Sequence, residues 1–186
     1  MDRKQPQHDA IVADLWTWIS EFVVVKSDFY KGKFAPCPYA QSALSAKSVD
    51  VVAWESGDFK SFIRAQAEQM RGMPDLTTRV VGLPPRAQSA WGVSTYVESL
   101  NAEFIPDNVF LNQGIAKSTV SRYPGSSGRP YFIVIANSLG AVLKGADALK
   151  RTDFYENWPA GHFELVVERR ERMAARYGDV RRSDNL

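Results

Sequence analysis

The sequence has few of the residues that build metal centres, and it has no long apolar run. It contains one cysteine and two histidines among 186 residues. One cysteine excludes an internal disulfide, and these three side chains cannot supply the ligand set of a structural zinc site. The longest apolar runs, 22–25 and 131–136, are too short to cross a bilayer. A disulfide-rich secreted scaffold, a zinc domain and a membrane-spanning protein are therefore excluded.

A strong charge of one sign is also absent. The 23 basic and 21 acidic side chains leave a formal net charge of +2, which is too small to indicate a nucleic-acid partner. The first nine residues are polar with no apolar signal segment behind them, so we expect a cytoplasmic protein. The sequence also lacks the glycine-rich phosphate-binding motifs and the helical His-Glu-x-x-His motif of zinc proteases.

What the sequence does contain is an alternation of helical and strand patterns. The spacing predicts helices over 9–25, 39–47, 59–71, 87–104, 139–150 and 163–176, and strands over 49–54, 76–83 and 131–136. The uninterrupted apolar run 131–136 indicates a central strand, whereas 106–120 is ambiguous. We expect a compact α/β domain (α+β is also possible) over 1–180, with helices on a small central sheet and a frayed tail at 181–186.

Cys37 lies between two prolines, directly before the predicted helix 39–47. A thiol beside the N–H groups of a helix start has a lowered pKa, which favours the thiolate that attacks electrophiles and binds metals. An inert packing residue is the other interpretation. Residues 37–40 are also similar to the Cys-Pro-Tyr-Cys motif of glutaredoxin-like proteins, with alanine in place of the second cysteine. That interpretation requires a buried strand directly before Cys37.

Ser138 follows the predicted central strand and opens a predicted helix. Residues 136–140 imitate the nucleophile elbow Gly-x-Ser-x-Gly with alanine at the first position. A catalytic triad would need His162 as its base and Asp147 or Asp153 as its acid, although no clear strand separates Ser138 from His162. We therefore favour Ser138 as a helix N-cap over Ser138 as a nucleophile.

The segment 121–129 combines serines and glycines with Arg122 and Arg129, directly before the predicted central strand. Such a loop can hold a carboxylate or a propionate through its backbone amides and its guanidinium groups. The alternative is a solvated turn without a binding role. Both interpretations stay open at this point.

Three stretches of the sequence resemble a known family. Residues 34–44 and 49–55 resemble the bacterial YqcI/YcgG-type haem proteins, whose members have a Phe-Pro-Cys block, a short helix and an apolar strand. Residues 129–138 are similar to their Pro-Phe-Phe-Val strand, which ends in a polar pair. Residues 37–40 and 121–124 show a looser similarity to uncharacterised bacterial proteins with a CPFA motif.

The resemblance implies that Cys37 is the thiolate ligand of a haem iron. It also implies a haem-dependent monooxygenase that hydroxylates an amine or guanidine nitrogen of an amino-acid-like small molecule in natural-product biosynthesis. Such an enzyme needs an external electron donor, and we expect no nucleic-acid or membrane partner.

Other charged and titratable side chains would bind carboxylates or transfer protons in such an enzyme. We expect Arg79, Arg122 and Arg129 to bind the haem propionates or a substrate carboxylate, because arginine presents a rigid fork to carboxylates. We expect His162 to shuttle protons as a catalytic residue. Two alternatives remain: a haem-free enzyme with Cys37 or Ser138 as its nucleophile, and a non-catalytic binding or accessory protein.

Overall fold

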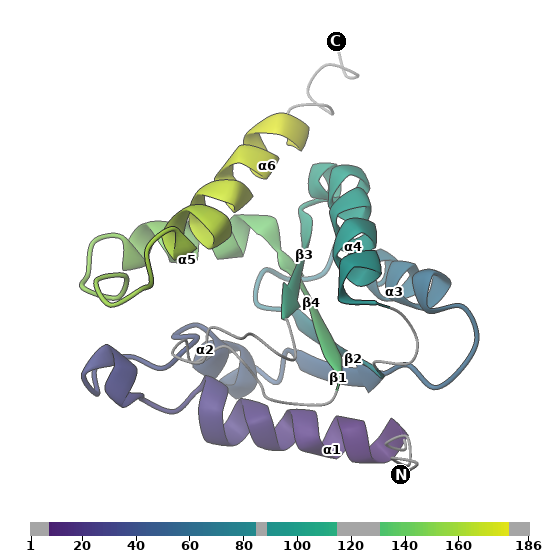
Figure 1. The fold of residues 1–186 in the computed structure, drawn as a ribbon, viewed down its shortest axis with the longest axis horizontal. Coiled ribbons are helices and arrows are strands. Elements are labelled where there is room, and N and C mark those ends of the chain that lie inside the picture. The colour runs from purple at the N-terminus through teal and green to yellow at the C-terminus, as the bar shows by residue number, and fades with distance from the viewer. Residues whose placement is uncertain (1–7, 85–88, 115–130, 179–186) are drawn as a thin grey trace.

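Four strands form a mixed sheet at the centre of the molecule (Figure 1). The computed structural model describes residues 8–84, 89–114 and 131–178. Within these ranges the strands lie in the order β1-β2-β4-β3 and comprise β1 (Val49–Ala53), β2 (Thr78–Leu83), β3 (Val109–Gly114) and β4 (Phe132–Ser138). Strand β1 is parallel to β2, whereas β4 is antiparallel to both β2 and β3. The place of β4 between two other strands confirms the central position that its apolar run predicts.

Helices surround this sheet, which confirms the predicted α/β class. The α-helices are α1 (His8–Trp18), α2 (Ala40–Ser45), α3 (Phe59–Glu68), α4 (Ala90–Phe104), α5 (Leu139–Leu149) and α6 (Arg169–Tyr177). Two π-helical segments, η1 (Ile19–Val23) and η5 (Glu164–Glu168), adjoin α1 and α6, and two 3₁₀ turns are η2 (Asp28–Tyr30) and η4 (Ile105–Asp107). None of the helices in the described ranges has the length and apolarity that a bilayer crossing requires.

Capping side chains determine where two of these helices begin. The carboxylate of Asp58 accepts hydrogen bonds from the amides of Lys60 and Ser61 at 3.4 and 2.9 Å, so α3 begins where its pattern predicts. The hydroxyl of Ser89 accepts from the amide of Gly92 at 3.1 Å. Ser89 is therefore the N-cap, and α4 begins at Ala90. The predicted helix over 87–104 starts too early.

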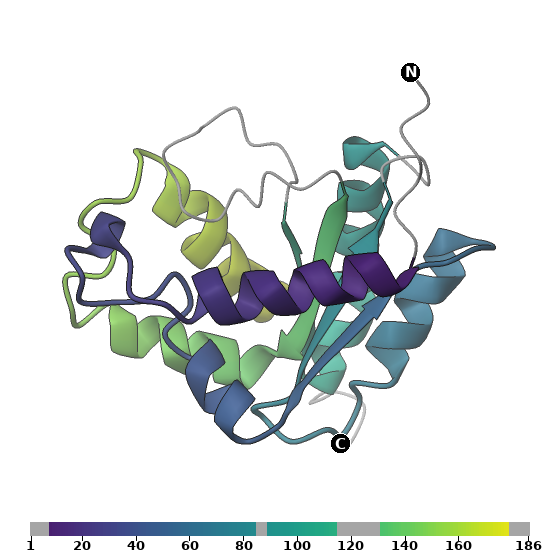
Figure 2. The same ribbon diagram turned by 90° about the horizontal axis from the view of Figure 1, so that it is seen from below.

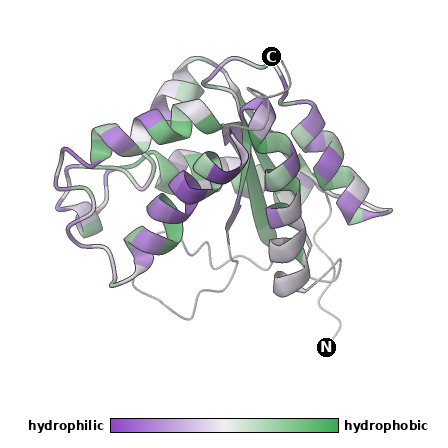
Figure 3. Cartoon of the chain, turned by 90° about the horizontal axis from the view of Figure 1, so that it is seen from above, coloured by the Kyte–Doolittle hydropathy of each residue, from purple (hydrophilic) through white to green (hydrophobic). Residues whose placement is uncertain are grey.

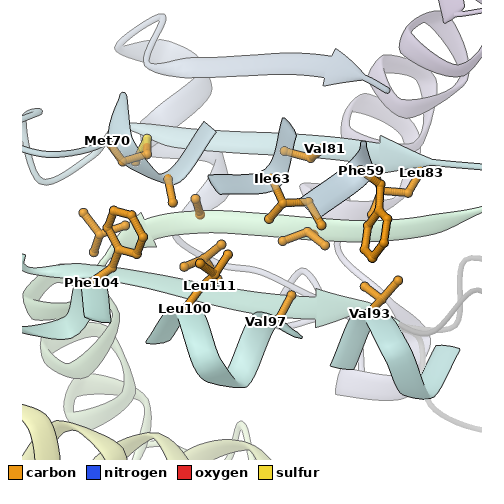
Figure 4. Packing of buried hydrophobic residues seen from close by; sticks show 14 residues of the cluster. Phe59, Ile63, Met70, Val81, Leu83, Val93, Val97, Leu100, Phe104 and Leu111 are labelled. Atoms are coloured by element: carbon orange, nitrogen blue, oxygen red, sulfur yellow. The ribbon is translucent and has the colours of Figure 1, made fainter. Parts of the chain in front are cut away.

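The two faces of the sheet are covered by different helices. Helices α3 and α4 pack on one face, and α1 lies across the other (Figures 1 and 2). Successive side chains of β2 point to opposite faces, so Val81 and Leu83 pack under α3 and α4, whereas Val80 packs under α1. Figure 4 shows Ile63 of α3 and Leu100 of α4 directed at these strands.

A third apolar cluster joins the sheet edge to the C-terminal helices. It consists of Ile105, Phe110, Leu139 and Met173, which come from η4, β3, α5 and α6. Figure 3 shows the apolar strands inside, with the hydrophilic residues gathered on the helices around them. Helices α5 and α6 are therefore anchored to the same sheet as α1, α3 and α4.

Strand β3 is the element that its sequence pattern leaves ambiguous, because Asn112 and Gln113 interrupt its apolar residues. It is paired on one side with β4. The fully buried side chain of Asn101 in α4 donates to the carbonyl of Leu111 at 2.9 Å and accepts from its amide at 2.7 Å. The tertiary contacts with α4 and β4, which a local pattern does not contain, therefore define this strand.

Helix α1 approaches the sheet most closely at Gly82 of β2. A Cβ atom on Gly82 would lie 2.5 Å from Cγ2 of Ile11 and 3.1 Å from Cδ1 of Leu15. Both residues are buried in the cluster under α1. Glycine at this position thus sets the distance between the helix and the strand.

We predict that Gly82→Ala destabilises the fold by about 1–3 kcal/mol, because the added methyl group overpacks the contact with Ile11. Urea denaturation followed by circular dichroism measures this change. Ile11→Ala, which removes the opposing methyl group, should make the double variant less costly than the sum of the two single changes. Strictly additive costs would show that the two positions do not clash.

Candidate functional site

Cys37 lies in the loop between η2 and α2, and the residue is exposed. Its amide donates to the carbonyl of Val23, at the end of η1, at 3.1 Å. The elements that precede Cys37 are helical, and β1 follows it. The buried strand that the glutaredoxin-like interpretation requires before the cysteine is therefore absent from the described residues 8–36.

Tyr39 attaches the Cys37 loop to helix α5. Its hydroxyl donates to the carbonyl of Gly145 at 2.9 Å. The ring also lies against Gly145, where a Cβ atom would stand 2.8 Å from Cε2 of Tyr39. Because Gly145 has no side chain, the tyrosine ring can rest on the helix backbone and hold the loop beside it.

The surroundings of the Cys37 thiol shift its pKa in opposite directions. Burial raises the pKa of Cys37 above its usual value, while hydrogen bonding by the amides of Ala40 and Tyr39 and the positive charge of Arg170 act to lower it. Solvent reaches part of the Cys37 residue, whereas protein atoms surround its sulfur. The surroundings of the sulfur set the free energy needed to ionise the thiol. The lowered pKa predicted from the position of Cys37 before a helix is therefore wrong: burial of the sulfur outweighs the nearby amides and raises the thiol pKa.

Arg170 in α6 is a residue of this site that the sequence patterns do not single out. Its guanidinium carbon lies 5.4 Å from the ring centre of Phe110, so it packs on the sheet edge. Burial raises the pKa of Tyr155 to about 12, and the charge of Arg170 acts in the opposite direction there as well. The positive charge of Arg170 thus acts on both Cys37 and Tyr155. In the sequence it is one of several charges in 163–176, which reads as a solvated helix face.

Segments 27–34 and 150–163 pack together as a unit that we term the aromatic lobe. The rings of Tyr30 and Phe154 are stacked with centroids 4.5 Å apart, and Phe34 meets Phe154 edge-on at 5.5 Å. Ion pairs of Lys31 with Glu156, at 3.3 Å, and of Lys33 with Asp153 close the outer side. The lobe therefore holds the chain just before Cys37.

His162 belongs to the aromatic lobe. Its ring is half-buried and meets the ring of Trp158 at a centroid distance of 4.7 Å. The indole N–H of Trp158 donates to the hydroxyl of Tyr30 at 3.3 Å. Burial lowers the pKa of His162 below 6.5. The structure thus places this residue in a packed aromatic environment, where its neutral form is favoured.

The structure does not bring Arg79 to Cys37. The Arg79 guanidinium pairs with Asp50 of β1 at 2.7 Å and donates to Gln66 of α3 at 3.1 Å. Arg79 therefore lies on the face that α3 covers, whereas Cys37 is held by η1 and α5. The predicted anion-binding residues Arg122 and Arg129, like the predicted tail 181–186, lie outside the described residues.

Ser138 caps helix α5, as its position in the sequence predicts. Its hydroxyl accepts from the amide of Ala141 at 3.3 Å and from Nδ2 of Asn108 at 3.0 Å, and it donates to Oδ1 of Asp75 at 2.9 Å. Its backbone angles, φ −65° and ψ 125°, are ordinary extended values and not those of a strained elbow. His162, the base of the alternative triad, lies in the aromatic lobe.

A small pocket of about 150 Å³ adjoins Ser138. Its lining residues are Met70, Gly72, Met73, Pro74, Asp107, Asn108 and Ser138. A water molecule in the liquid occupies about 30 Å³, so this space corresponds to a few waters and is far smaller than a porphyrin. Within the described ranges, no group of three or more His, Cys, Asp or Glu side chains is arranged to hold a metal ion.

We predict that Ser138→Ala costs about 1–2 kcal/mol of stability, because the cap and the hydrogen bonds to Asp75 and Asn108 are lost together. Chemical denaturation measures this cost. A fluorophosphonate probe should leave Ser138 of the wild-type protein unlabelled, since the hydroxyl is engaged as a cap. Covalent capture of Ser138 would instead identify it as a nucleophile.

A second prediction concerns pH and His162. Because its pKa is lowered in the folded state, the unfolded chain binds more protons than the folded one below about pH 6.5. Stability should therefore fall as the pH is lowered from about 7.5 to 5, and His162→Gln should show a shallower fall. Denaturation midpoints at several pH values give the two slopes, and identical slopes would contradict the assignment.

Known proteins do not identify this site. Comparisons of the chain with models of protein families, with curated proteins and with solved structures found no match. The resemblance to YqcI/YcgG-type haem proteins thus stays a prediction, and the residues around Cys37 carry the functional inference.

Proposed function

We propose that the protein is a haem-thiolate oxygenase in which Cys37 would hold the haem iron through its sulfur. Its substrate would be an amino-acid-like small molecule, hydroxylated at an amine or guanidine nitrogen. One observation carries this proposal: backbone hydrogen bonding at Ala40 and Tyr39 and the charge of Arg170 act on the thiol of the exposed residue Cys37 in favour of its thiolate, the form that ligates iron. Burial outweighs these groups and raises the thiol pKa, so the metal would have to supply the remaining stabilisation of the thiolate.

The chemistry of the donor set fits a haem. A porphyrin supplies nitrogen donors to its own iron, so one protein thiolate is a sufficient ligand. Hydrogen bonds to the ligating sulfur tune the electron density on a haem iron, and the amides of Tyr39 and Ala40 are placed to provide them. The attachment of Tyr39 to Gly145 keeps the ligand loop in place.

In this proposal the bound haem supplies the activation of oxygen, and the side chains bind, orient and exchange protons. Cys37 would have to lose its proton to hold the haem iron, so haem binding would release a proton. Because burial raises the pKa of Cys37, this ligation is expected to strengthen as the pH rises. Arg170 keeps a positive charge next to the site, and His162 offers a titratable group in the adjoining aromatic lobe.

A haem-free thiol nucleophile is the second candidate. The thiolate of the same exposed residue, with backbone hydrogen bonding from Ala40 and Tyr39, would suit attack on an electrophilic carbon. Both candidates need the thiolate of Cys37. They differ in whether purified protein binds haem, which absorption spectroscopy decides.

We predict that the protein binds one haem per chain through sulfur. The ferrous–CO complex should show the strongly red-shifted Soret band of thiolate ligation, and Cys37→Ser and Cys37→Ala should lose this band along with oxygenation. Both variants should remain folded, because replacing one small loop side chain usually costs no more than about 1–3 kcal/mol. Ser45→Ala, an exposed change in the adjacent helix α2, serves as the matched control.

The possible outcomes separate the candidates. The absence of a Soret band after haem supplementation would end the haem proposal, and specific alkylation of Cys37 with loss of activity would then favour the nucleophile. A folded Cys37→Ala protein with full activity would remove both candidates together.

A further inference from the structure

We infer that β1 is an edge at which the chain associates with a second copy of itself. The two β1 strands pair in antiparallel orientation and join the two sheets into one, so backbone hydrogen bonds supply the contact. The partner that fits this surface is thus a protein of the same sequence. The β1 edge contains no residue of the Cys37 site, and the association is independent of the proposed haem function.

Strand β1 is the outermost strand on its side of the sheet and has unused backbone groups. The carbonyl of Ser48 accepts from the amide of Thr78 at 2.8 Å. The amide of Trp54 donates to the carbonyl of Gly82 at 2.9 Å. Because backbone groups alternate in direction along a strand, the even-numbered residues face β2 and the odd-numbered ones face outward. The outward residues of β1 are Val49, Val51 and Ala53. Among the described residues, their N–H and C=O groups have no hydrogen-bond partner.

The opposite edge of the sheet, on β3, is closed at its centre. The side-chain amide of Asn101 donates to the carbonyl of Leu111 at 2.9 Å and accepts from the amide of Leu111 at 2.7 Å. Asn101 therefore occupies the outward backbone groups of β3 as a neighbouring strand would. Since an uncovered edge is a template for pairing with another chain, β1 is the edge that can add a strand.

The outward groups of β1 are complementary to those of a second β1. In an antiparallel pair centred on Val51, each Val51 exchanges both of its hydrogen bonds with Val51 of the second copy. In the same register Val49 pairs with Ala53 of the second copy. Any other antiparallel register leaves at least one of these residues unpaired. A two-fold axis relates the two chains, which is the commonest symmetry of homodimers.

Charges at the two ends of β1 favour this orientation. Lys47 precedes the strand, Glu55 follows it, and both side chains are exposed. In the antiparallel pair, Lys47 of each copy lies near Glu55 of the other, so opposite charges meet twice. A parallel pair would bring Lys47 near Lys47 and Glu55 near Glu55. Charge pairs of this kind determine the register and the partner more than the affinity.

One charged residue lies within β1, and such residues often protect an edge from pairing. This residue, Asp50, forms an ion pair with Arg79 of the same chain at 2.7 Å. In the register centred on Val51, Asp50 stands opposite Val52 of the second copy. Like charges therefore do not face each other across the edge.

Apolar side chains of α1 flank the same edge. Asp14 accepts a hydrogen bond from Tyr131, which precedes β4, so this side of α1 points toward β4. Because successive residues of a helix are rotated by about 100°, Val12 and Trp16 lie on the opposite side, toward β1. Trp16 is 38% exposed although it is a large apolar residue. Association through β1 brings two copies of α1 alongside each other and removes apolar area from water.

The test measures the mass of the full chain by sedimentation velocity over a range of concentrations, together with amide hydrogen exchange. We expect a reversible dimer. The outward amides of Val49, Val51 and Ala53 should exchange more slowly as the dimer forms. The amides of Asp50 and Val52, which already bond to β2, should be insensitive to concentration and serve as internal controls.

We predict that Lys47→Glu and Glu55→Lys each weaken the dimer about tenfold or more in low-salt buffer, because each change replaces two attractive contacts by repulsive ones. The variant with both changes restores opposite charges and should regain the wild-type dissociation constant. Lys144→Glu, an exposed change in α5, is the matched control for charge and should dimerise as the wild type does.

A wild-type chain that stays monomeric up to its solubility limit would overturn the inference. A dimer that withstands both single charge reversals, with outward β1 amides that exchange at the monomer rate, forms through another surface and would overturn it as well. Weakening by the single reversals without recovery in the double variant would refute the register centred on Val51. Recovery in the double variant, together with slowed exchange at the outward amides, would support the β1 dimer.

Discussion

The packing of β2 and β4 between two layers of helices is the constraint on which the rest of the domain depends. These strands pair along their whole length, from Thr78 opposite Asn137 to Leu83 opposite Phe132. Both of their faces are buried, one under α3 and α4 and the other under α1. Because a strand covered on both faces needs apolar residues at successive positions, this arrangement accounts for the apolar run of β4 and for Val80, Val81 and Leu83 of β2.

The candidate site is tied to this pair of strands from two directions. Helix α1 is seated on Gly82 of β2, and η1 continues it to Val23, whose carbonyl accepts from the amide of Cys37. On the other side, Ser138 ends β4 and caps α5, which carries the Gly145 that supports Tyr39. The position of the thiol thus depends on a helix and a strand that lie far from it in the sequence.

Charged groups are distributed unevenly around this frame. Arg79 is held by Asp50 and Gln66 on the α3 side, where its charge supports the sheet edge. Arg170 is packed on Phe110, and its positive charge acts on the Cys37 thiol in favour of the thiolate. The two arginines have the same chemistry, but one forms an ion pair and a hydrogen bond beside the sheet while the other packs on an aromatic ring.

The sequence by itself determined the local features of this protein. Periodicity defined the helices, the apolar run 131–136 marked the central strand, and the place of Ser138 before a helix identified its capping role. The prolines on both sides of Cys37 likewise predict the loop in which it lies. Each of these inferences uses residues within a few positions of one another, where spacing and backbone preference act directly.

Only the tertiary structure decided which distant residues meet. Strand β3 is defined by Asn101 and β4, and the Cys37 loop by Val23 and Gly145, none of which a local pattern connects. For the same reason the sequence cannot tell that Arg79 lies against Asp50 and Gln66, or that Arg170 packs on Phe110. Burial and proximity arise from packing between segments and not from the order of residues along the chain.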